Sequence, residues 1–284
     1  MRVLIAGCGY VGIELAGRLV SRGADVFAMR RRPGGQPAGV SAVAADVGDP
    51  STLRSLPEAL DAIVYLVSAD ARDEGAYRAA YVDGVAHLLA ATRAGRFLFA
   101  SSTSVYAQRG GEWVDEASPT RPSAMNGRLV LEGESTVRAR HPEACCVRFG
   151  GIYGPGRRRL LDAVAAGDKA WRPGHYTNRI HRDDCAGVLA HLLGLRELPP
   201  VRVAVDREPA LEETLVRWLA ARLGAPEPGP ARGEGAAGPG SKRCSSAALV
   251  ASGYEFRYPT FREGYGAMLS GGAPPASLRG ARDR

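Results

Sequence analysis

Residues 2–12 read Arg-Val-Leu-Ile-Ala-Gly-Cys-Gly-Tyr-Val-Gly, and they carry the strongest fold signal in the chain. Arg2–Ala6 is a short apolar run of the kind that forms a fully buried strand. Glycines follow at positions 7, 9 and 12, and a helical pattern begins at once, with Val11, Leu15 and Leu19 on one face. A strand, a glycine-rich turn and a helix in this order predict a dinucleotide-binding site, although such a turn also occurs without a ligand.

Each glycine has its own task in such a site. Gly7 permits the tight turn, Gly9 lets the backbone approach a pyrophosphate, and Gly12 allows the helix to pack closely on the strand. The pyrophosphate then lies against unpaired N–H groups at the positive end of the helix, where Tyr10 and Val11 stand. We therefore expect cofactor contacts from Gly7 and from residues 9–12.

Composition limits the class of protein. The chain has 284 residues, 45% of them apolar, which suits a single large domain. No apolar run is long enough to span a membrane, and the five cysteines show neither disulfide nor metal spacing, so we expect a cytoplasmic protein without a metal. The net charge of +7 comes from arginine, because Lys169 and Lys242 are the only lysines. These arginines are scattered and no nucleic-acid-binding motif is present, so we expect no nucleic-acid partner.

Further strands are predicted at residues 25–29, 41–47, 62–67, 96–100 and 201–205, with helices at 77–93 and 211–223. Alternating strands and helices predict an α/β fold with a doubly wound parallel sheet, the Rossmann architecture. We expect one domain over residues 1–284, with a small C-terminal substrate lobe drawn mainly from 153–182 and 207–270. The proline- and glycine-rich stretch 226–240 is predicted to be a flexible loop, and 271–284 a polar tail.

The strand ends predict the rest of the cofactor site, because the carboxyl ends of parallel strands share one edge of the sheet. Arg30 and Arg31 stand at the tip of the second strand, where arginine suits the 2′-phosphate of NADP(H) and an acid suits NAD(H). We expect NADP(H) to be preferred, with NAD(H) still open, although a solvated charge run is the alternative. Other expected cofactor residues at strand ends are Asp46, Val47, Val67, Ser68 and Ser101.

The chain resembles an extended short-chain dehydrogenase/reductase of the epimerase and dehydratase type, and within it an atypical subgroup. The resemblance rests on residues 7–12, Asp46-Val47, residues 101–106, 148–157 and 178–184, and the closing run 253–259. It implies that Ser102 hydrogen-bonds the reacting oxygen, and that Gly150 and Gly151 pass beside the nicotinamide.

One family feature is missing. Active relatives carry a Tyr-x-x-x-Lys pair, in which an ammonium one helical turn away lowers the pKa of a phenol that exchanges a proton with the substrate. In this chain no tyrosine has a lysine four residues on, and the best alignment places Asn126 and Val130 at the two positions. We expect chemistry that does not depend on a phenolate, unless Tyr106, Tyr153 or Tyr176 takes the empty place.

His181 is our candidate for a substitute acid, because histidine titrates near neutrality, although a structural histidine is the alternative. Thr103, Arg157, Tyr176 and Arg179 are the predicted substrate contacts, and Arg157 could instead lie in solvent.

Two functions stay open. One is an NADP(H)-binding oxidoreductase or epimerase acting on a polar small molecule with an altered acid–base set. The other is a non-catalytic cofactor-binding sensor or scaffold. A homodimer is compatible with either.

Overall fold

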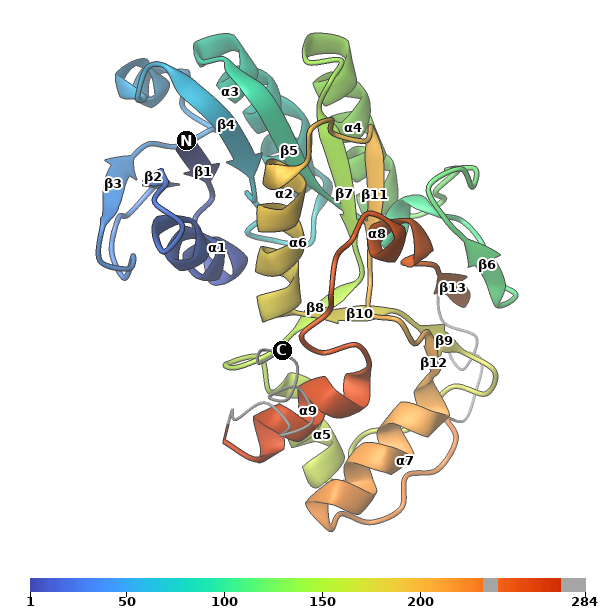
Figure 1. Ribbon diagram of the computed structural model, residues 1–284. Helices are drawn as coiled ribbons and strands as arrows, with labels where there is room; N and C mark the ends of the chain where they lie inside the picture. The colour runs from blue at the N-terminus through green and yellow to red at the C-terminus, as the bar shows by residue number, and fades with distance from the viewer. Residues whose placement is uncertain (232–239, 272–284) are drawn as a thin grey trace.

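Seven parallel strands form the central sheet in the order β11-β7-β5-β4-β1-β2-β3. The computed structural model describes residues 1–231 and 240–271. The strand order reverses beside β1, which creates the crevice where ligands bind in folds of this kind. The predicted doubly wound Rossmann sheet is thus confirmed (Figure 1). The strands are β1 Arg2–Ala6, β2 Asp25–Arg30, β3 Val40–Ala44, β4 Leu60–Tyr65, β5 Ala94–Ser102, β7 Cys145–Phe149 and β11 Val201–Ala204.

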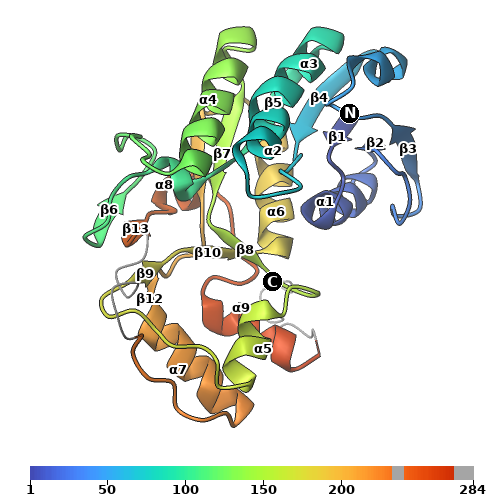
Figure 2. The ribbon, with the colours of Figure 1, turned by 180° about the vertical axis from the view of Figure 1, so that it is seen from behind.

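Helices cover both faces of the sheet (Figures 1 and 2). Val3 and Ile5 of β1 join the core on one face, and Leu4 and Ala6 join the core on the other. Burial on both faces explains why this strand is a continuous apolar run rather than an alternating one. The first face carries α1 Tyr10–Val20 and α6 Arg182–Gly194, and the second carries α2 Glu74–Arg78, α3 Gly84–Ala91 and α4 Met125–Arg140.

The helix predicted at 77–93 is interrupted. A π-helical turn, Ala79–Asp83, separates α2 from α3, and residues of this turn line the cofactor cleft described below. Single π turns inside α-helices occur frequently at functional sites. Its side chains Ala80 and Val82 are buried.

A small lobe lies beyond the carboxyl ends of the strands (Figure 1). Its core is formed by Leu161, Leu215 and Phe261, one from each of its helices. The lobe helices are α5 Arg159–Ala165, α7 Glu212–Leu223 and α9 Phe261–Leu269. Short strand pairs connect it to the sheet: β8 Gly151–Tyr153 with β10 Arg179–His181, β9 Tyr176–Thr177 with β12 Ala210–Leu211, and β6 Glu112–Val114 with β13 Lys242–Cys244.

The C-terminal part divides differently from the prediction. Of the described residues 240–271, only α9 packs in the lobe, whereas β13 pairs with β6, and α8 Ala247–Ala251 lies against β11. Leu249 and Phe256 join the core that α1 and α6 share on the first face of the sheet, and they add apolar cover to that face. Most of the predicted loop 226–240 and of the predicted tail 271–284 falls outside the described residues.

Two further expectations concern absent features. Among the helices of residues 1–231 and 240–271, none is long and apolar enough to cross a membrane. Within the same ranges, no three His, Cys, Asp or Glu side chains gather as a metal site would require.

Candidate functional site

A cleft of about 1150 Å³ follows the carboxyl ends of the sheet strands, and we call it the cofactor cleft. Nearly all the residues expected to hold a cofactor line it, and the exception, Gly151, lines the neighbouring pocket. The predicted residues that line the cleft are Gly7, Gly9, Tyr10, Val11, Gly12, Arg30, Arg31, Asp46, Val47, Val67, Ser68, Ser101 and Gly150.

The glycine loop fits a dinucleotide. Gly7 has a φ of +80°, and a Cβ there would lie 2.6 Å from the backbone nitrogen of Val67. A Cβ on Gly12 would lie 3.1 Å from the Ile5 side chain, so glycine at this position lets the helix pack closely on the strand. A Cβ on Gly9 would meet only the Gly7 oxygen, at 3.9 Å, so the space in front of Gly9 is open to the cleft. No side chain caps the start of α1, which leaves its N–H groups free for phosphate oxygens.

The adenosine end of the cleft contains an ion pair that the sequence did not reveal. Asp70, in the loop after β4, accepts two hydrogen bonds from Arg31, at 2.6 and 2.8 Å. Arg30 instead donates to the Gly34 carbonyl at 2.7 Å. An acid does therefore stand at the tip of the second strand, although it is distant in sequence. The pair is exposed and weak, so a ligand phosphate can replace Asp70 at low cost.

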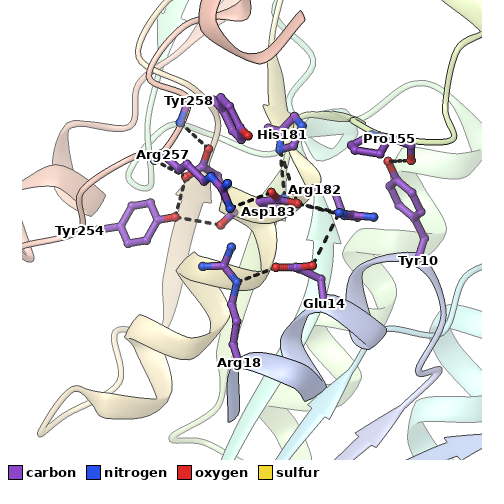
Figure 3. A network of polar contacts seen from close by, with 11 residues as sticks. Tyr10, Glu14, Arg18, Pro155, His181, Arg182, Asp183, Tyr254, Arg257 and Tyr258 are labelled. Atoms are coloured by element: carbon purple, nitrogen blue, oxygen red, sulfur yellow. Dashed lines mark hydrogen bonds and ion pairs between the residues drawn. The ribbon is translucent and has the colours of Figure 1, made fainter. Parts of the chain in front are cut away.

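Tyr10 connects the glycine loop to the loop after β8. Its hydroxyl donates to the Pro155 carbonyl at 2.9 Å (Figure 3). The Arg157 guanidinium lies 4.1 Å from the centroid of the Tyr10 ring. Arg157, expected at the substrate, therefore lines the cofactor cleft instead.

A second pocket of about 300 Å³ adjoins the cleft, and we call it the polar pocket. Ser102 and Gly150 line both spaces, so the two meet at these residues. Ser102 Oγ accepts from the Ser104 N–H at 3.1 Å, and its own hydrogen remains available to a ligand oxygen. The polar pocket is lined by Ser102, Thr103, Ser104, Gly150, Gly151, His175, Tyr176, Thr177, Asn178, Gly240 and Lys242.

A buried polar network contacts the strand ends at which the cofactor cleft and the polar pocket meet. Glu134 of α4, fully buried, accepts from Arg148 at 2.8 and 2.7 Å and from the Ser101 hydroxyl at 2.6 Å. Arg148 also donates to the Tyr106 hydroxyl at 2.9 Å. Burial opposes ionisation of Glu134, yet its bonds to Arg148 hold the pKa of its carboxyl below the ordinary value. The charged pair is therefore complete and fixes the strand ends on which Ser101 and Ser102 stand.

Asn126 and Val130 lie at the start of α4, away from the linings of both the cleft and the polar pocket. Val130 is 1% exposed and packs in an apolar cluster with Val105, Tyr106 and Val203. A Cβ on Gly127 would lie 2.4 Å from the Ser104 carbonyl oxygen, so this end of α4 is pressed against the loop after β5. The position aligned with the family lysine is thus part of the core.

His181 is placed differently from our expectation. It is 1% exposed and packs against the rings of Tyr153 and Tyr258. Its Nδ1 accepts from the Asp183 N–H at the start of α6 (Figure 3). Burial lowers the pKa of its imidazole to about 4, so the ring is neutral at physiological pH. His181 contributes to neither lining, and the structure favours the structural alternative.

The predicted substrate contacts are also divided. Thr103 and Tyr176 line the polar pocket, but Arg179 is buried behind it, where it donates to Thr177 Oγ1 at 2.5 Å. His175 and Lys242 of the polar pocket were not among the residues predicted from the sequence. A signal for Lys242 existed, since it is one of two lysines in an arginine-rich chain.

Comparison with known proteins agrees with this geometry. Residues 3–172 match the NAD dependent epimerase/dehydratase family. A 3-diazoavenalumate denitrifying reductase from Streptomyces sp is 30% identical over 254 residues, which cover 80% of this chain and 83% of that protein.

Solved structures share the fold. A "putative NAD-dependent epimerase/dehydratase from methylobacillus flagellatus" is 36% identical, with a TM-score of 0.80 over 95% of this chain and 98% of that one. Human epimerase family protein SDR39U1 (isoform 2), solved with NADPH, is 21% identical with a TM-score of 0.77, over 96% of this chain and 99% of that one. From its sequence, its glycine-loop cleft and its relatives, this chain belongs to the NAD-dependent epimerase/dehydratase family.

Proposed function

We propose that this protein is an NADP(H)-dependent reductase that acts on a small electrophile held in the polar pocket and requires no phenolic proton donor. The observation that carries the proposal is the junction at Ser102 and Gly150, where the cofactor cleft meets the polar pocket while Asn126 and Val130 stand outside both. Bound in the cleft, NADP(H) supplies hydride. The chain then has to bind and orient the substrate, rather than move a proton.

Ser102 is the side chain best placed to orient the substrate, because its hydroxyl lines both spaces and keeps its hydrogen free. The neighbouring His175 is buried, and this burial, together with Arg172, lowers the pKa of its imidazole. A neutral imidazole is a poor acid at neutral pH. These groups suit an electrophile that becomes stable on accepting hydride alone.

Iminium and diazonium ions are electrophiles of that kind. Reduction of a diazonium ion forms a C–H bond and releases dinitrogen, and the hydride cancels the positive charge, so no proton is needed. The denitrifying activity named for the Streptomyces relative, on a diazo compound, supports this substrate class.

The test follows hydride into product. Purified protein is mixed with NADPH deuterated at nicotinamide C4 and, in parallel, with an aryl diazonium salt, a cyclic iminium and a neutral ketone. We expect deuterium in the product of at least one cationic electrophile, and slower reaction of the ketone, which needs a proton. The Ser102→Ala variant should react more slowly than wild type with unchanged NADPH affinity. Tight NADPH binding without transfer to any of the three would favour a non-catalytic sensor or scaffold instead.

A further inference from the structure

Lys242 is a buried ammonium group with no counter-ion among the residues that the structure describes. Lys242 is 7% exposed to solvent, and its Nζ donates to the Tyr106 carbonyl at 3.1 Å. Within residues 1–231 and 240–271, no carboxylate forms an ion pair with it, whereas Lys169, the other lysine, has Glu212 at 2.7 Å. An ammonium carries three donors, so Lys242 has donors to spare. A buried charge left unpaired is costly, which implies that another group matches it in the working protein.

The surroundings of Lys242 favour a negative ligand. Among the described residues, the lining of the polar pocket contains no acidic side chain, and Lys242 is its one lysine or arginine. Arg109 lies near enough to add positive potential at Nζ. Ser104 Oγ, also in the lining, is buried and has no hydrogen-bond partner among the described residues. A cation and a free hydroxyl thus line the same space.

Lys242 is also held in place rather than mobile. Asn178 donates from Nδ2 to the Lys242 carbonyl at 2.9 Å and accepts at Oδ1 from the Cys244 N–H at 2.7 Å. The carbonyl that Nζ contacts belongs to Tyr106, whose hydroxyl is fixed by Arg148. Backbone and side chain are therefore positioned before any ligand arrives, as a binding site requires.

We propose that the polar pocket binds a carboxylate of the substrate and that Lys242 is its cationic partner. One ammonium neutralises one negative charge, so a monoanion suits the pocket better than a phosphate dianion, which usually binds arginine forks. About 300 Å³ is at the small end of ligand pockets, and it fits a small carboxylic acid rather than a nucleotide sugar. The inference rests on the proposed function, because it names the substrate class of the same pocket.

The test uses the two lysines. Protein labelled with ¹³C at lysine Cε gives two side-chain signals, and the one missing from Lys242→Met is Lys242. In the presence of NADP⁺, benzoate is titrated at constant ionic strength, with neutral benzamide and inorganic phosphate as parallel probes. We expect benzoate to shift the Lys242 signal and to leave Lys169 unmoved, with benzamide and phosphate binding more weakly.

Loss of one charge-assisted hydrogen bond should weaken benzoate binding to Lys242→Met about ten- to 150-fold, measured by calorimetry. Arg54→Met, which removes one exposed positive charge from the segment between β3 and β4, outside both linings, is the matched control and should bind normally. Lys242→Met should unfold at a temperature no lower than wild type, because an unpaired buried charge is removed; a lower temperature would indicate a structural lysine and overturn the assignment.

Equal binding of benzoate and benzamide, or unchanged benzoate affinity in Lys242→Met, would overturn the proposal. Phosphate binding as tight as benzoate would overturn its monoanion part. Benzoate accepts no hydride, so these results do not depend on turnover. Failure of the deuterium-transfer test therefore leaves the carboxylate site standing, and failure of the titration leaves the reductase proposal standing.

Discussion

The cofactor cleft and the polar pocket are neighbours, yet they are built in different ways. The glycine-loop end of the cleft is made by consecutive residues, because Gly7–Gly12 place a turn and a helix start directly against the sheet. The polar pocket is assembled from four distant segments, residues 102–104, 150–151, 175–178 and 240–242, which tertiary contacts bring together. The glycine loop offers backbone N–H groups to a ligand, whereas the polar pocket offers side chains such as Ser102 and Lys242. We therefore expect the cofactor cleft to lose affinity for its ligand when access to the backbone N–H groups is blocked. The polar pocket should lose affinity when one of its anchoring side chains is removed.

The strongest test of the backbone-built site is Gly9→Val. The valine side chain would project into the cleft, where phosphate oxygens must approach, so we expect NADPH affinity to fall at least about 100-fold as several charge-assisted bonds are lost together. The fold should survive, because a Cβ at Gly9 meets only one atom, at 3.9 Å. Fluorescence titration and a thermal melt measure both quantities. Gly17→Ala, on the same helix but outside the cleft, is the control; full affinity in Gly9→Val would show that the phosphates bind elsewhere.

A substitution at Glu212 tests the polar pocket, because Glu212 contacts His175 of its lining. Its carboxylate accepts from Lys169 at 2.7 Å and from the Arg172 backbone at 3.0 Å, and its own N–H donates to the His175 carbonyl at 2.8 Å. Burial opposes ionisation, but the bonds from Arg172 and Lys169 lower the pKa of Glu212 to about 2. A depression from 4.5, at about 1.4 kcal/mol per pH unit, contributes about 3 kcal/mol of stability.

Because the folded-state pKa is depressed, this contribution is present above pH 4.5 and is lost as the pH falls towards 2. Glu212→Gln should be destabilised at pH 7 in urea unfolding, and its deficit should shrink on acidification. NADPH affinity at pH 7 should change little, because Glu212 does not line the cofactor cleft. A deficit that is independent of pH would show that the ionised form is not what matters.

Substitutions at Arg31 and Asp70 test the end of the cofactor cleft that we expect to bind adenosine. If Arg31 binds the 2′-phosphate, NADPH should bind about ten- to 150-fold more tightly than NADH, and Arg31→Ala should remove most of that preference. Asp70→Asn should act in the opposite direction and strengthen NADPH binding up to about fivefold, because it frees Arg31 from a weak exposed pair. Titrations of both cofactors at fixed salt measure the ratios. NADH binding as tightly as NADPH in wild type would refute the assigned preference.

The smallest effect is expected at the phenols. Tyr106 donates to the Asp115 carbonyl and Tyr153 is buried in the lobe core, so only Tyr176 of the three reaches the polar pocket. Tyr176→Phe, Tyr106→Phe and Tyr153→Phe should each leave kcat for a cationic electrophile unchanged. A loss of about 10²–10⁴-fold at one of them, with cofactor affinity intact, would show that a phenol supplies a proton after all.

The sequence by itself determined the features that arise from neighbouring residues. β1 was predicted with its observed bounds, Arg2–Ala6, since a continuous apolar run suits a strand buried on both faces. The glycine loop followed from spacing alone, and the absence of a Tyr-x-x-x-Lys pair is a property of the sequence itself. Local geometry and periodicity are short-range properties, and the sequence records them directly.

Tertiary structure decided the features that depend on distant residues. The pairing of Arg31 with Asp70 spans 39 positions, and the contact of Lys242 with Tyr106 spans 136. His181 is a residue type that often acts in catalysis, but packing between Tyr153 and Tyr258 removes it from water and keeps it neutral. Whether a charged or titratable side chain meets ligand, solvent or core depends on which segments fold against it, and no local pattern encodes that choice.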